Sequence, residues 1–75
     1  MTVEAVKHIV KESGATAIRV YTTAPHTDPF KIHINSFLTL DSRRKVLVWV
    51  RVDEWGDKYP TYIAIDQITH IEVIV

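Results

Sequence analysis

The sequence predicts a mainly β fold: an N-terminal α-helix followed by a five-stranded, strongly bent antiparallel sheet. From Lys45 to Asp53, valines alternate with other side chains, and a period of two in β-branched residues is typical of a strand. The alternation from Phe30 to Leu40 is long enough to bend around a small barrel. Short connections between successive strands favour closure of such a sheet into a barrel.

Length and composition limit how this chain can become stable. Its 75 residues make a single domain of residues 1–75, and a core of that size is only marginally stable alone. It has no cysteine, so neither a disulfide framework nor a cysteine-based zinc site is available. We therefore expect the chain to bury further surface by associating with copies of itself.

The charge balance excludes a generally basic nucleic-acid binder. Nine basic residues balance nine acidic ones, so any nucleic-acid surface has to be a local patch. No stretch has transmembrane length and no signal peptide is recognisable. The expected location is the cytoplasm, with no membrane partner.

The expected elements follow from periodicity and turn residues. Thr2 can cap a helix over residues 3–13, and Gly14 can end it in the left-handed conformation. Strands are expected over residues 16–22, 30–40, 45–53, 61–65 and 69–75. The small Ser36 is the easiest place for the long second strand to bend. Two prolines predict a loop over Ala24–Pro29, and the turn residues Trp55, Gly56 and Asp57 predict another over Glu54–Pro60.

The central strand over residues 45–53 has two different faces. Val46, Val48, Val50 and Val52 make one face wholly apolar, and we expect that face to be buried. Leu47 and Trp49 lie on the other face between charged residues, so that face should be half covered. A tight turn at Asp66–Ile68, with one turn of 3₁₀ helix as an alternative, leads to the last strand.

The stretch from Tyr62 to Val73 resembles the second motif of the Sm/LSm family, which includes the bacterial RNA chaperone Hfq. Both consist of a short strand, a tight turn ending in isoleucine, and a final strand. The order of one helix and five strands is also similar, and Asp41 looks like the acidic residue of the first motif. The chain differs in having Ser36 in place of a glycine and Arg43–Arg44 in place of a Met-Asn pair.

The resemblance implies a homo-oligomeric ring of roughly five to seven subunits, in which the last strand of one subunit pairs with the fourth strand of the next. An apolar final strand supports this, because an unpaired edge of that kind invites aggregation. The expected interface residues are Tyr62, Ile63, Ile65, Ile71, Val73 and Val75.

The resemblance also implies that the ring holds short single-stranded RNA. The candidate RNA-binding residues are Asn35, Phe37, Asp41, Arg43, Arg44, Lys45, Asp66 and Gln67. The basic cluster among them is favoured as a solvated turn over a phosphate site, and Phe37 as a packed residue over a stacking platform. The alternative function is a protein-interaction or structural ring without RNA, which the zero net charge favours.

No residue pattern predicts catalysis, a cofactor or a metal. Ser42 has no histidine near it in the sequence, and no paired carboxylates suggest acid–base chemistry. His26 and Asp28 are a possible metal pair, but no third ligand has a suitable spacing. We therefore expect a non-enzymatic protein without a cofactor or a metal site.

Overall fold

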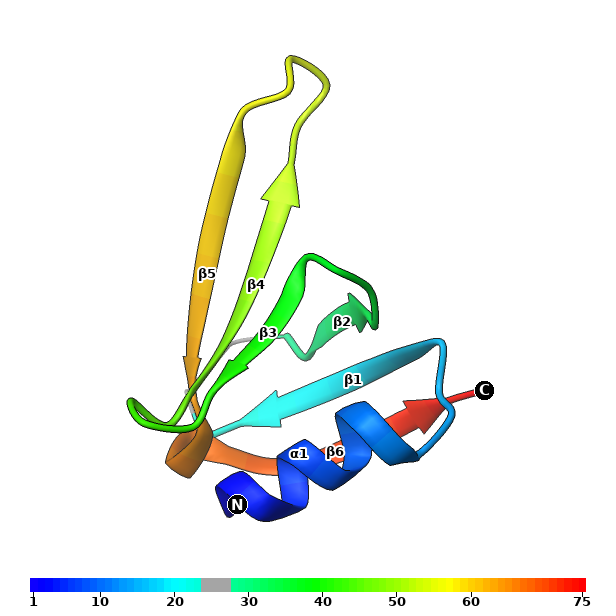
Figure 1. The fold of residues 1–75 in the computed structure, drawn as a ribbon, viewed down its shortest axis with the longest axis vertical. Coiled ribbons are helices and arrows are strands. Elements are labelled where there is room, and N and C mark those ends of the chain that lie inside the picture. Colours follow the sequence, from blue (N-terminus) through cyan, green and yellow to red (C-terminus); the bar gives the residue numbers. More distant parts are fainter. Residues whose placement is uncertain (24–27) are drawn as a thin grey trace.

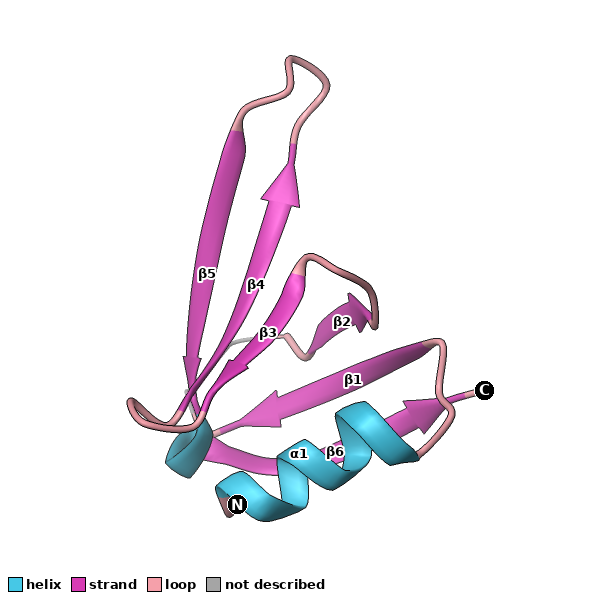
Figure 2. Cartoon of the chain, in the orientation of Figure 1, coloured by secondary structure: helices cyan, strands magenta, loops and turns pink. Residues whose placement is uncertain are grey.

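The computed structural model describes residues 1–23 and 28–75. One helix, six strands and one short 3₁₀ helix follow one another (Figure 1, Figure 2). They are α1 (Val3–Glu12), β1 (Ala17–Thr22), β2 (Phe30–His33), β3 (Leu38–Asp41), β4 (Val46–Val52), β5 (Lys58–Ala64), η1 (Ile65–Gln67) and β6 (Ile68–Ile74).

The helix begins at Val3 as predicted and ends at Glu12, one residue before the predicted end. The Ala5 N–H donates a hydrogen bond of 3.2 Å to the Thr2 hydroxyl, which satisfies one of the free amides of the first turn. Gly14 has a φ of 73°, the left-handed conformation that a glycine adopts at little cost. One apolar stripe of α1 packs on the sheets, and Val6 is fully buried there.

The strands form two three-stranded antiparallel sheets, in the orders β2–β1–β6 and β3–β4–β5. The predicted closed barrel with five strands in one sheet is therefore wrong. The predicted strand over residues 30–40 is divided, because the chain turns between His33 and Leu38. There the Asn35 side chain accepts a hydrogen bond of 2.8 Å from the Phe37 N–H. A local side-chain bond of this kind competes with the ladder of a continuous strand.

The core lies between the two sheets and α1. Its fully buried side chains come from α1, β1, β2, β4, η1 and β6: Val6, Ile18, Val20, Ile32, Leu47, Ile65 and Ile68. β4 is the central strand of its sheet, as predicted, but the expected orientation of its faces is wrong. Leu47 is fully buried, whereas Val46, Val48 and Val50 are half-buried and Val52 is 47% exposed. The core covers only the face of β4 that carries Leu47, so the valines lie on the opposite, outer face of the sheet.

The β4–β5 hairpin extends beyond the rest of the molecule (Figure 1). β3 pairs with β4 only as far as Trp49, so the outer part of the hairpin is a two-stranded ribbon. The predicted loop over Glu54–Pro60 is partly wrong, because β5 already begins at Lys58. Pro60 is tolerated in that strand because β5 is an edge strand. The N–H that proline lacks would point outward, away from β4, so no bond between the strands is lost.

Candidate functional site

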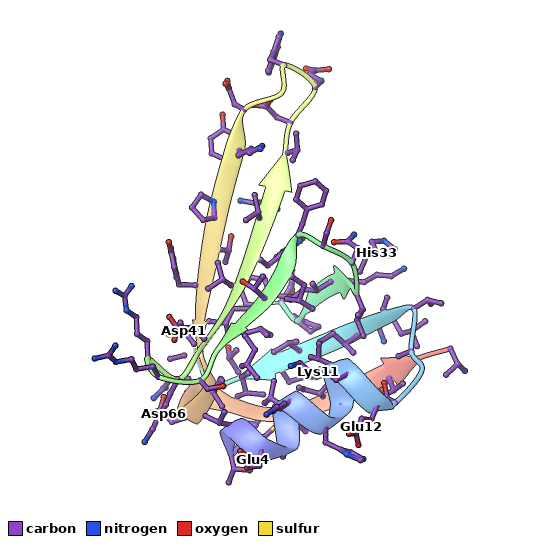
Figure 3. The ribbon with its side chains drawn as sticks, in the orientation of Figure 1. Glu4, Lys11, Glu12, His33, Asp41 and Asp66 are labelled. Atoms are coloured by element: carbon purple, nitrogen blue, oxygen red, sulfur yellow. The ribbon has the colours of Figure 1, made fainter. Side chains whose placement is uncertain are left out.

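Two of the predicted RNA-binding segments meet at one end of the molecule. The β3–β4 turn, Asp41–Lys45, lies beside η1, and the Lys45 C=O accepts a hydrogen bond of 3.0 Å from the Ile65 N–H. Figure 3 shows Asp41 and Asp66 at this end, with Glu4 of α1 nearby. The structure therefore brings together two turns that are separated by the whole β4–β5 hairpin.

The β3–β4 turn is held by its own acidic residue. The Asp41 carboxylate accepts a hydrogen bond of 3.0 Å from the Arg44 N–H, and the Arg44 guanidinium lies 3.9 Å from the same carboxylate. Lys45 has a φ of 57°, which is uncommon for a residue with a side chain. Arg43, Arg44 and Lys45 are all exposed, so three cations face solvent around one partly neutralising carboxylate.

Asn35 and Phe37 do not join this turn. They lie at the opposite end of β3, and the four steps along the chain from Phe37 to Asp41 span roughly 13 Å when extended. Phe37 is 44% exposed, so it is not a core residue. Gln67 lies in η1, where its side-chain oxygen accepts a hydrogen bond of 2.6 Å from the Thr23 hydroxyl.

The predicted interface residues divide between the core and the sheet edges. Ile63 and Ile65 are buried in the core of their own subunit, so their side chains are not available to a neighbour. Tyr62 is 64% exposed on β5 and Val73 is 42% exposed on β6. Both strands are edge strands within the described residues. Ile71 is half-buried and Val75 is largely exposed.

Sequence reasoning missed an apolar area on the outer face of the β3–β4–β5 sheet. Register places Val48 beside Tyr62, and Val50 beside Pro60. The Val50 N–H also donates to the Phe37 C=O at 2.9 Å, which places Phe37 beside Val50 on the same outer face of the sheet. The alternation of valines was the available signal, but periodicity alone does not say which face of a strand the core covers.

A groove between α1 and β3 was also missed. It has a volume of about 330 Å³ and is lined from the helix by Lys7, Val10 and Lys11, and from β3 and the turn after it by Leu38, Thr39, Leu40 and Ser42. The spacing of Lys7 and Lys11 places them on one side of α1, which was the only signal in the sequence.

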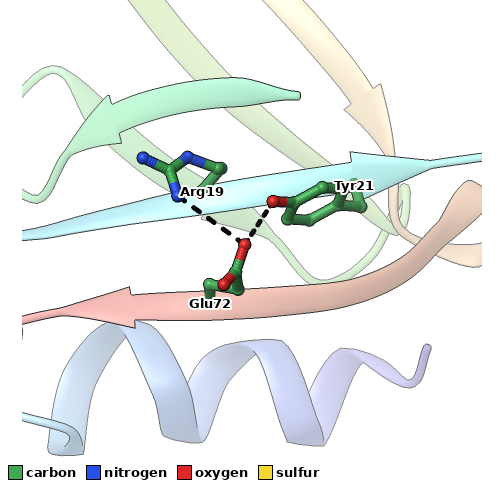
Figure 4. Close-up of polar contacts among 3 residues, drawn as sticks. All are labelled: Arg19, Tyr21 and Glu72. Atoms are coloured by element: carbon green, nitrogen blue, oxygen red, sulfur yellow. Dashed lines mark hydrogen bonds and ion pairs between the residues drawn. The ribbon is translucent and has the colours of Figure 1, made fainter. Parts of the chain in front are cut away.

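A polar cluster occupies the outer face of the other sheet (Figure 4). The Tyr21 hydroxyl donates to the Glu72 carboxylate, and the Arg19 guanidinium lies 3.7 Å from that carboxylate. The hydrogen bond to Glu72 raises the pKa of Tyr21, and the same bond lowers the pKa of Glu72. The His70 ring stacks on Tyr21 with 4.1 Å between ring centroids. The cluster joins β1 to β6, and its tyrosine is held protonated, which does not suit a general base.

Residues 1–23 and 28–75 contain no group of three histidine, aspartate or glutamate side chains that could hold a metal ion. His26, one half of the weak metal pair, lies outside the described residues. Within the described chain, no helix has the length and apolar character needed to cross a bilayer.

Fold and site together define a mainly β domain that has, within the described residues, one N-terminal helix, two sheets with four edge strands, and a basic turn. Comparisons of the chain with protein-family models, curated proteins and solved structures found no match.

Proposed function

We propose that the protein is an Sm-like RNA-binding protein, which forms a homo-oligomeric ring and holds short single-stranded RNA at the β3–β4 turn and η1. The observation that carries the proposal is the meeting of these two turns beside two unpaired sheet edges. The ring would have roughly five to seven subunits, joined head to tail.

Assembly is supported by the state of the two edge strands. β5 and β6 each pair on one side only within the described residues. An unpaired strand edge is a template for another strand. β5 presents the exposed Tyr62 and β6 the exposed Val73. Pairing β6 of one subunit with β5 of the next would cover both edges and part of the apolar outer face.

RNA binding is supported by the cations of the β3–β4 turn. Arg43, Arg44 and Lys45 are exposed at the point where η1 approaches. In a ring these turns would repeat around the axis, and repeated cations attract a phosphate backbone. Phe37, at the other end of β3, is exposed enough to stack on an unpaired base, which adds affinity with little sequence preference.

A second candidate is a protein-interaction or structural ring without RNA. Asp41 is paired with Arg44 in the turn, and Asp66 is exposed beside it. Three cations and two carboxylates leave a local charge of only +1 at the site. That small excess favours a partner other than a polyanion.

Assembly is tested first, by light scattering at micromolar concentration. The register and the Lys45–Ile65 hydrogen bond turn the Ile63 backbone toward β4, so the Tyr62 N–H points outward. Tyr62→Pro should therefore remove an edge donor and give a folded monomer, as checked by circular dichroism. A monomeric wild-type protein would exclude the ring.

RNA binding is tested by fluorescence anisotropy with short U-rich and A-rich RNA. Affinity should fall with added salt and in Arg43→Ala/Arg44→Ala. Lys31→Ala is the matched control, because Lys31 lies on β2 away from the turn. Absence of binding at low salt, with an intact ring, would reject the RNA function and leave the second candidate.

A further inference from the structure

The groove between α1 and β3 combines apolar side chains with the free edge of a strand. This distinguishes it from the β3–β4 turn and from the β5 and β6 edges that the proposed ring would use. Val10, Leu38 and Leu40 form its apolar part. Its volume of about 330 Å³ lies at the small end of the range for binding clefts. It is built within one subunit and does not depend on the proposed ring.

The backbone of β3 is unpaired on the side of this groove. Within the described residues, β3 pairs only with β4. The hydrogen bond from the Val50 N–H to the Phe37 C=O fixes which residues face β4. Because antiparallel bonding alternates along a strand, Thr39 and Asp41 also face β4, and Leu40 faces away from it. The Leu40 N–H and C=O and the Leu38 C=O are thus directed to the free edge.

Two lysines stand on the helical wall of the groove. Lys7 and Lys11 are exposed, and neither takes part in an ion pair among the described residues. Lys7 and Lys11 are the charged residues of α1 that line the groove. Glu4 and Glu12 share a second surface hollow with them, and the Glu12 carboxylate lies 2.7 Å from the His8 ring. Glu4 lies in the first turn of the helix, and Asp41, at the end of β3, is engaged by Arg44.

We propose that this groove binds an extended, acidic segment of a partner protein, which adds as a strand to the free edge of β3. The partner backbone would pair with Leu40, and alternate apolar side chains would contact Val10 and Leu38. Acidic side chains on the segment would meet Lys7 and Lys11. This is strand addition beside a helix, in which backbone bonds give affinity and side-chain contacts give selectivity.

A peptide fits these features better than RNA does. RNA would use the two lysines, but it cannot satisfy the alternating donor and acceptor groups of a strand edge. The groove offers a phosphate backbone only the hydroxyls of Thr39 and Ser42 beside the lysines, and no exposed aromatic side chain lines it for stacking. The salt dependence of binding would be correspondingly modest, since only two cations are involved.

The probe is a synthetic seven-residue peptide that alternates glutamate and valine, titrated into ¹⁵N-labelled protein. The expected result is shifts of the amide signals of Leu40, Lys7 and Lys11, with slower exchange of the Leu40 amide. The same peptide with lysine in place of glutamate should bind at least about tenfold more weakly, because two attractive charge pairs become repulsive. Absence of shifts at millimolar peptide, or shifts confined to β5 and β6, would overturn the proposal.

Two further arms test the strand pairing and the charges. Two N-methylated peptides are compared. Methylating the alternate backbone nitrogens that would donate to β3 should abolish binding, whereas methylating the other nitrogens, which point away from β3, should preserve it. Equal effects of the two patterns would overturn strand addition. Lys7→Glu/Lys11→Glu should weaken the acidic peptide by about tenfold or more, and Lys31→Glu should not. Equal losses in the two variants, or hexauridylate giving the same shifts as the peptide, would overturn the assignment to an acidic peptide.

Discussion

The orientation of β4 is the feature of this fold most directly tested by mutation. Leu47 is fully buried in the core, whereas Val48, the next residue, is half-buried on the outer face. Truncating a fully buried leucine to alanine removes its contacts and leaves a cavity, at a cost of about 2–5 kcal/mol. Truncating Val48 removes fewer contacts and should cost about 0.5–1 kcal/mol.

These costs are large on the scale of a small domain. A chain of 75 residues has a stability of roughly 4–11 kcal/mol and an unfolding entropy near 0.16 kcal/mol/K. A loss of about 3 kcal/mol in Leu47→Ala therefore lowers the melting temperature by about 20 °C. Val48→Ala should lower it by only about 3–6 °C.

The assay is urea unfolding followed by the fluorescence of Trp49, which is half-buried beside the core. Both variants are measured at two protein concentrations a factor of ten apart, because subunit dissociation would make the midpoint depend on concentration. Val52→Ala, near the exposed end of the ribbon, is the matched control. A loss in Val48→Ala equal to or larger than that in Leu47→Ala would refute the assigned orientation of β4.

Three other predictions concern the hairpin tip and the polar cluster. Partial desolvation raises the pKa of Asp53, but hydrogen bonds from the Asp57 and Trp55 N–H groups and the Tyr59 hydroxyl outweigh it and lower the pKa below 3.8. The contribution of Asp53 to hairpin stability should therefore be complete above pH 3.8 and be lost progressively as the pH falls below it, and Asp53→Asn should abolish that acid dependence in amide exchange. Gly56→Ala should loosen the same hairpin by about 1–2 kcal/mol, because Gly56 has a φ of 82° with open space around it; unchanged exchange would contradict this. Glu72→Gln should bring the raised pKa of Tyr21 back toward 10.0 in an absorbance titration, and Glu12→Gln should leave it unchanged.

Local features of the fold could be predicted because they depend on neighbouring residues. Thr2 caps the helix and Gly14 ends it in both the prediction and the structure. The turn before the last strand is a 3₁₀ helix over Ile65–Gln67, one residue earlier than expected. The valine-rich strand was also predicted, since β-branched residues at period two favour an extended chain, and it is the central strand of its sheet as expected.

The division of the long second strand depended on more than its pattern. Its alternation of apolar residues continued through Asn35 and Ser36, so the sequence predicted one bent strand. In the structure the Asn35 side chain bonds to the Phe37 N–H and the chain turns. Two sheets result, and the β3 edge beside α1 is left unpaired within the described residues.

By itself, the sequence determined the helix, the approximate positions of most strands, and that the chain has a local basic cluster without a basic surface. Only the tertiary structure decided which face of β4 is buried, that the Asp41–Lys45 turn meets η1, and that Lys7 and Lys11 border a groove with Leu38 and Leu40. The physical reason is that periodicity and capping act within a few residues, whereas burial and site geometry depend on which distant segment packs on each face.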